Sequence, residues 1–134
     1  MKKITFILGL VFAFNLSAQT QYENGMNKAF ALWKTQQNAE AVQVFERIAG
    51  AEKENWLPSY YAATILIMDG FAIKDESALN THLNKAQALL DQAAAISKRN
   101  PEIFITQAML QTVYVAFDGQ KYGMTLSAKN TQLY

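Results

Sequence analysis

The sequence contains no cysteine, and only two prolines and six glycines occur among its 134 residues. Without cysteine the chain forms no disulfide, offers no thiolate to a structural metal site and has no cysteine nucleophile. No run of like charge occurs and the formal net charge is +1, which argues against nucleic acid and anionic membrane surfaces as partners. Strand-type alternation and hairpin turn signals are also missing. The sequence therefore predicts an all-α fold.

Motifs that carry chemistry are missing as well. Residues 119–123 lack the spacing and the Gly-Lys-Ser/Thr ending of a phosphate-binding loop. His82 is the only histidine, and no carboxylate occupies a neighbouring helical position, so a serine triad would have one isolated base. We expect no enzyme activity, no catalytic residue, no cofactor and no metal ligand. The alternative is a small-ligand or metal-binding domain, or an enzyme, that uses the region Asp69–His82.

The first eighteen residues have the layout of a secretory signal peptide. Lys2 and Lys3 form a short basic region, residues 4–16 are mainly apolar, and small residues end at Ala18. The apolar run is short and interrupted by polar residues and glycine, which argues against a permanent membrane anchor. We expect cleavage after Ala18, export to the periplasm or medium of a Gram-negative bacterium, and one domain over residues 19–134.

The remaining chain is organised around one apolar segment, residues 56–68. Its apolar side chains cover almost the whole circumference of a helix, so neighbours must pack on several of its sides. It is too short to span a bilayer and is typical of a buried core helix. Apolar residues at spacings of three and four predict further helices around it, and these run over residues 22–36, 39–55, about 75–98, 101–117 and, more weakly, 120–134.

Turn and capping residues set the expected limits of these helices. Asn38 is expected to be the N-cap of the second helix, and Asp75 is expected near the start of the fourth. Asp69-Gly70 and Asp118-Gly119 are interpreted as stops of the third and fifth helices, because glycine commonly follows the last helical turn. Short polar connections then join consecutive helices into hairpins.

Two of the hairpins have matching second helices. Alanine, a large apolar residue four positions on, and a small residue three further occur at Ala86, Leu90 and Ala93, and Pro101 follows. On these residues the chain resembles the tetratricopeptide repeat family. Residues 41–48, followed by Pro58, repeat the pattern with isoleucine in place of the small residue. The physical reason for the pattern is close packing of antiparallel helices.

The resemblance implies antiparallel helical hairpins stacked as a short right-handed solenoid, with a third hairpin that is incomplete. The interval from Ala41 to Ala86 is longer than the roughly 34 residues usual in that family. A non-repeating helical bundle is the alternative. The apolar residues after position 120 lack a cap, so we expect either that the chain continues in a longer protein or that this end self-associates.

Five residues are candidates for a binding surface. Gln107, Gln111 and Tyr114 form a polar stripe on the apolar helix 101–117, and the resemblance places this helix on a concave face where partner segments bind. An ordinary solvated face is the alternative. Phe30 and Trp33 either pack on the central helix or expose an aromatic anchor for a partner. We expect a non-catalytic scaffold that binds a protein or peptide.

Overall fold

The computed structural model describes the backbone of residues 2–131 and the side chains of residues 17–126 and 128. Within residues 2–131 every regular element is a helix and no strand occurs, which confirms the all-α prediction. The elements are α1 (Lys2–Lys34), α2 (Asn38–Ala51), α3 (Leu57–Gly70), α4 (Glu76–Ile96), α5 (Pro101–Phe117) and α6 (Gly119–Thr131).

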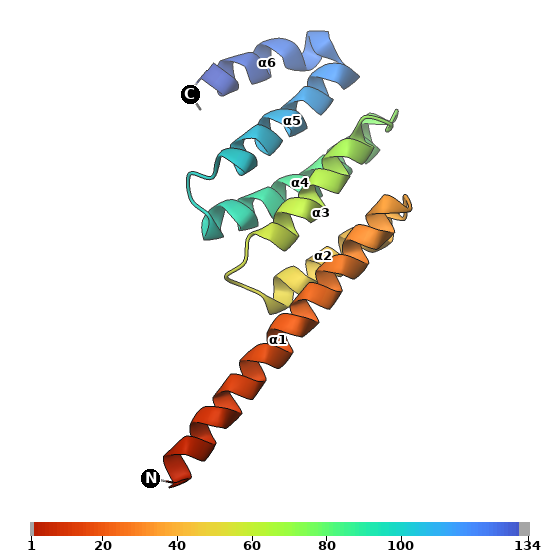
Figure 1. Cartoon of the computed structure of the whole chain (residues 1–134). Helices are drawn as coiled ribbons and strands as arrows, with labels where there is room; N and C mark the ends of the chain where they lie inside the picture. The colour runs from red at the N-terminus through yellow and green to blue at the C-terminus, as the bar shows by residue number, and fades with distance from the viewer. Residues whose placement is uncertain (1, 132–134) are drawn as a thin grey trace.

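Consecutive helices pack side by side as antiparallel hairpins. The connections between the helices are only a few residues long, and such short connections favour antiparallel packing of each helix against the preceding one. In Figure 1, α1 and α3 lie in front of α2 and α4, and each helix contacts the next along the chain. In addition α3 contacts α5. The fold is therefore built from contacts between near neighbours in the sequence.

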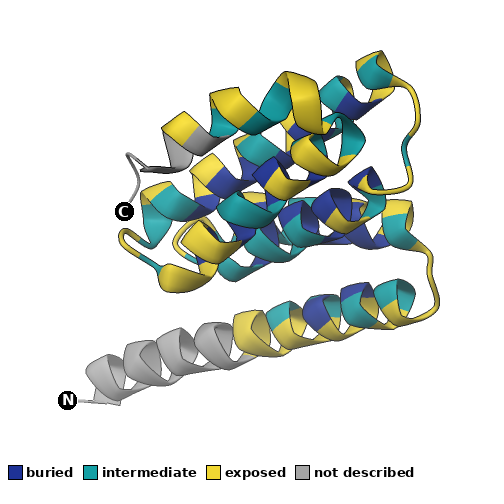
Figure 2. Ribbon diagram, turned by 90° about the horizontal axis from the view of Figure 1, so that it is seen from above, coloured by how far each residue is buried: buried dark blue, intermediate teal, exposed yellow. Residues whose placement is uncertain are grey.

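The central position expected for residues 56–68 is confirmed for α3. This helix packs against α2, α4 and α5, and Ile65, Leu66 and Ile67 in succession are buried. Three consecutive buried residues point in different directions around a helix, so only neighbours on several sides can cover them. Figure 2 shows the buried positions gathered where the helices face one another.

The first helix is longer than expected, because α1 begins at Lys2 instead of Tyr22. Its N-terminal part extends beyond the other helices (Figure 1). Residues 17–20 are exposed, Tyr22 is the first half-buried residue and Met26 the first buried one among the described side chains. Most of the expected signal segment lies outside the residues whose side chains are described. Within the described part of the chain, no helix combines the length and apolarity needed to cross a membrane.

The prediction that Asn38 caps α2 is wrong. Gln37 is the N-cap residue and makes no capping bond with its side chain. The amide of Asn38 instead donates to Asp69 Oδ1 over 2.6 Å, and so ties the start of α2 to the end of α3. The predicted capping role of Asp75 is confirmed, since its carboxylate accepts from the backbone N–H of Ala78 at 2.8 Å.

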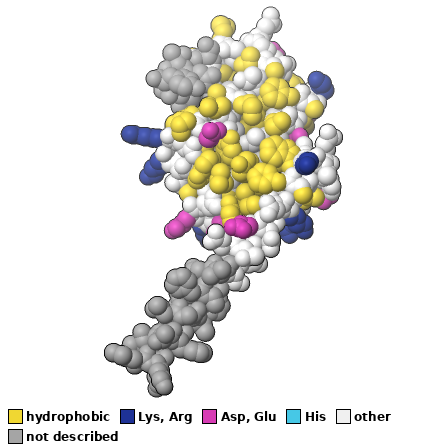
Figure 3. Space-filling model, in the orientation of Figure 1, with side chains coloured by type: hydrophobic (Ala, Val, Ile, Leu, Met, Phe, Trp, Pro, Cys, Tyr) yellow, Lys and Arg dark blue, Asp and Glu magenta, His cyan; other side chains and the backbone are white. Residues whose placement is uncertain are grey.

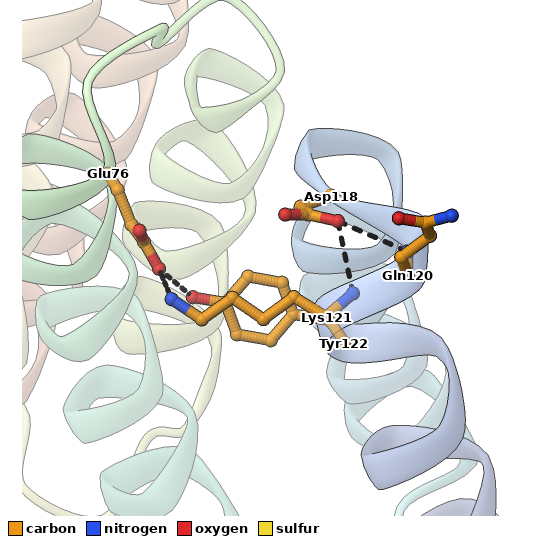
Figure 4. Close-up of polar contacts among 5 residues, drawn as sticks. All are labelled: Glu76, Asp118, Gln120, Lys121 and Tyr122. Atoms are coloured by element: carbon orange, nitrogen blue, oxygen red, sulfur yellow. Dashed lines mark hydrogen bonds and ion pairs between the residues drawn. The ribbon is translucent and has the colours of Figure 1, made fainter.

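The two predicted Asp-Gly stops do lie where α3 and α5 end, and each pair has a further role. Gly70 is the buried last residue of α3 and its φ is not positive. A Cβ there would lie 3.1 Å from Val113 and 3.2 Å from Leu83, so glycine at this position permits close packing of α3 against α4 and α5. Asp118 accepts from the backbone N–H groups of Gln120 and Lys121, and it therefore starts α6 (Figure 4).

Candidate functional site

Phe30 and Trp33, the aromatic candidates on α1, are half-buried in a cluster of rings. The Phe30 ring meets Tyr61 of α3 at 4.8 Å and Phe45 of α2 at 5.2 Å, both edge-on. Trp33 lies 6.5 Å from Phe30 and from Tyr61. Edge-to-face rings at these distances stabilise packing beyond their buried area. The cluster therefore holds the first hairpin against the central helix.

Of the two glutamine candidates on α5, Gln107 contacts a neighbouring helix and Gln111 is buried. Gln107 and Gln87 of α4 exchange two amide hydrogen bonds of 2.7 Å each. Gln111 is buried, with 5% exposure, and its Oε1 has no hydrogen-bond partner among the described residues. The stripe that the sequence spacing predicted is therefore not an open polar surface at Gln107 and Gln111.

Tyr114, the third candidate on that stripe, packs against α6. Its ring is tilted against Tyr122 at a centroid distance of 5.0 Å. The residue is half-buried, and burial raises the pKa of the Tyr114 hydroxyl. Gln107 thus contacts α4 and Tyr114 contacts α6, whereas Phe30 and Trp33 contact α2 and α3. The five candidates for a binding surface therefore fall into two groups with different neighbours.

A cluster of polar side chains joins α6 to α4. These contacts link residues far apart in the chain and were not predicted from the sequence. Glu76 Oε1 accepts hydrogen bonds from both Lys121 and Tyr122 (Figure 4). Lys121 also lies 5.3 Å from the centre of the Tyr122 ring. The hydrogen bonds from Lys121 and Tyr122 hold the pKa of Glu76 below its usual value. The bond to Glu76 raises the pKa of both donors.

Three polar residues of the region Asp69–His82, considered above as a ligand site, make contacts within the chain. Asp69 accepts from Asn38, and Asp75 caps α4. His82 Nε2 lies 2.8 Å from the backbone carbonyl of Leu66, so the nitrogen that faces this oxygen carries the proton. Among the described residues, no three histidine, aspartate or glutamate side chains gather as a metal ion requires.

An exposed apolar surface lies over α3 and adjoins α5, and residue periodicity had not singled it out. Hydrophobic side chains gather there in Figure 3. No charged residue occurs over 56–68 or 103–117. Met68 is 51% exposed and Ile105 is 63% exposed. We define the apolar face as the exposed and half-buried residues that recur at spacings of three and four on the two helices, namely Tyr61, Thr64 and Met68 on α3 and Ile105, Met109 and Thr112 on α5.

A hollow of about 260 Å³ lies where the loop after α3 meets the end of α5. Phe71 and Phe117 line it, together with the backbone at Gly70. Lys74 is its one charged lining residue. Ala116, which also lines the hollow, is four residues beyond Thr112 on the exposed stripe of α5. The apolar face therefore leads toward a recess of the size of one large side chain.

No family model, curated protein or solved structure matches the chain.

Proposed function

We propose that the chain is an exported, non-catalytic scaffold that binds a protein or peptide segment on its apolar face. The observation that carries this proposal is the exposure of uncharged, largely apolar side chains on two adjoining helices. Met68 and Ile105 are each more than half exposed, and exposed apolar patches of this kind mark sites of protein interaction. The adjoining hollow would receive one large apolar side chain of the partner.

A tetratricopeptide-like solenoid is the architecture that we propose for this scaffold. It is supported by the antiparallel hairpins, by packing between sequence neighbours, and by prolines at the start of α3 and α5. In such an array the first helices of the hairpins form one surface, which here comprises α1, α3 and α5. The apolar face lies on two of these three helices, as a partner-binding surface would require.

Export is the second element of the proposal. Residues 17–20 are exposed and the buried core starts at Met26. Cleavage after Ala18 would therefore leave every buried side chain of the described core in the mature protein. Removal of the first eighteen residues would therefore be compatible with an intact described core.

The binding proposal is tested with a displayed library of random peptides and the folded full-length chain. We expect enrichment of peptides with several apolar residues. Met68→Glu and Ile105→Glu should each weaken their binding at least about tenfold, because a charge must lose its water to be covered. Ala88→Glu, at an exposed position of α4, is the matched control and should bind as the unaltered chain does.

Circular dichroism and thermal melting establish that the three variants keep the fold. If no peptide is enriched, or if the enriched peptides bind both apolar-face variants as tightly as the control, the apolar face is not a binding surface.

A further inference from the structure

The last helix, α6, is attached in a different way from the others. Each of the helices α2 to α5 contributes at least five buried residues, whereas none of the described side chains of α6 is buried. Met124 is 84% exposed. Two glycines, Gly119 and Gly123, also weaken the helix itself. Little hydrophobic free energy therefore holds α6 in place.

The contacts that do hold α6 are concentrated at its first turns. Lys121 and Tyr122 hydrogen bond to Glu76 of α4, and Tyr122 packs on Tyr114 of α5. We call the three residues Glu76, Lys121 and Tyr122 the latch. Only Asp118 separates α6 from α5, and its backbone is extended. Among the described residues, the latch and the ring of Tyr114 thus supply the side-chain contacts that position the start of α6.

The surface of α5 next to this latch carries an unsatisfied polar group. Gln111 lies one turn before Tyr114 on α5, so the two side chains are neighbours on the surface of that helix. On α6, Leu126 is one turn beyond Tyr122 and is half-buried. A buried carbonyl oxygen such as Gln111 Oε1, without a partner among the described residues, destabilises the docked arrangement. Undocking of α6 would hydrate this group.

We propose that α6 is a releasable strap that undocks as a unit about Asp118 and uncovers Gln111 and Tyr114 for another helix. The body formed by α1 to α5 stays folded, because its core contains none of the described side chains of α6. The helix that fits the uncovered surface carries the chemistry of α6 itself, a tyrosine for Tyr114 and a cation for Glu76. Its use by a binding partner rests on the scaffold function proposed above, while the release of α6 does not.

Hydrogen exchange followed by mass spectrometry tests the release in the full-length chain. Amides of α6 should exchange at least about tenfold faster than those of α3, as expected for a locally opening unit. Glu76→Gln should accelerate α6 further and leave α3 unchanged. Glu46→Gln is the matched control, because it removes the comparable surface ion pair with Lys85, and it should leave α6 unchanged. Equal protection of α6 and α3, or equal acceleration of both by Glu76→Gln, overturns the proposal.

A labelled synthetic peptide of residues 118–131 tests the surface beneath the strap. It should bind the full-length Tyr122→Ala chain, in which the strap is loosened, at least about tenfold more tightly than the unaltered chain, because the attached strap competes at high effective concentration. The same peptide with Tyr122→Ala is the control and should lose this preference. Equal binding of the peptide to both chains overturns the proposal. Failure of the library selection on the apolar face would remove the scaffold function and leave these two results intact.

Discussion

Gly70 is the position where α3 approaches α4 and α5 without a side chain, and Gly70→Ala tests the packing there. The added Cβ would lie 3.1 Å from a methyl of Val113 and 3.2 Å from one of Leu83. Both neighbours are almost fully buried, at 1% and 0% exposure, so they have little room to move. Overpacking a core in this way costs typically about 1–3 kcal/mol. The better helix propensity of alanine returns up to about 1 kcal/mol in a helix interior and less at the last residue of α3.

The expected result is a net loss of about 0.5–2 kcal/mol in the free energy of unfolding for Gly70→Ala. Urea denaturation followed by far-ultraviolet circular dichroism measures it. Gly50→Ala is the matched control, because nothing lies within 4 Å of its Cβ, and it should be neutral or stabilising by up to about 1 kcal/mol. In Gly25→Ala the Cβ meets only the side-chain end of the half-buried Ile48, so an intermediate value is expected. A Gly70→Ala chain as stable as the Gly50→Ala chain would refute the close packing of α3.

Leu66 is 7% exposed, and Leu66→Ala should lower the free energy of unfolding by about 2–5 kcal/mol; a loss under about 1 kcal/mol would contradict its place in the core. Gln107→Ala removes both hydrogen bonds to Gln87, whose amide nitrogen keeps Asp91 as a partner, and should destabilise by about 1 kcal/mol, whereas Gln107→Ala combined with Gln87→Ala should cost less than the sum of the two single changes. The pKa of Glu76 is lowered from 4.5 in the folded chain, so its contribution to docking is complete above pH 4.5 and is lost as the pH falls through the folded-state pKa. Amides of α6, corrected for intrinsic exchange, should therefore lose protection in acid, and Glu76→Gln should remove this pH dependence. Intact-mass analysis of exported material should give a chain that begins at Gln19, and a soluble cytoplasmic product of full length would argue against export.

The helices themselves were largely predictable from the sequence. Apolar spacing of three and four located α2 to α5 within a few residues of their observed ends, because the stripe that is buried is also the stripe that the sequence displays. The beginning of α1 was missed, since the first eighteen residues were assigned to a processing segment before helices were considered. Segments of that kind also favour helix, and the structure continues α1 through them.

Roles that depend on distant neighbours could not be predicted from local patterns. Glycine after an apolar run indicates a helix end, and α3 does end at Gly70. The reason that a side chain does not fit there is the close approach of Leu83 and Val113, which local sequence does not reveal. The polar stripe on α5 was identified correctly as a stripe. The contacts of this stripe come from residues on other helices, Gln87 against Gln107 and Tyr122 against Tyr114. No local pattern at Glu76 indicated that its carboxylate reaches α6.

The packing of each helix against its sequence neighbours also bears on how the chain reaches its structure. The helix pairs in substantial contact are consecutive, apart from α3 with α5, so few contacts require the closure of long loops. Chains with such low contact order fold on the order of microseconds to milliseconds. The pair of α1 and α2, with its aromatic contacts to α3, can form before the residues of α5 are available. The order of assembly can therefore follow the order in which the chain is delivered, from its N-terminal end.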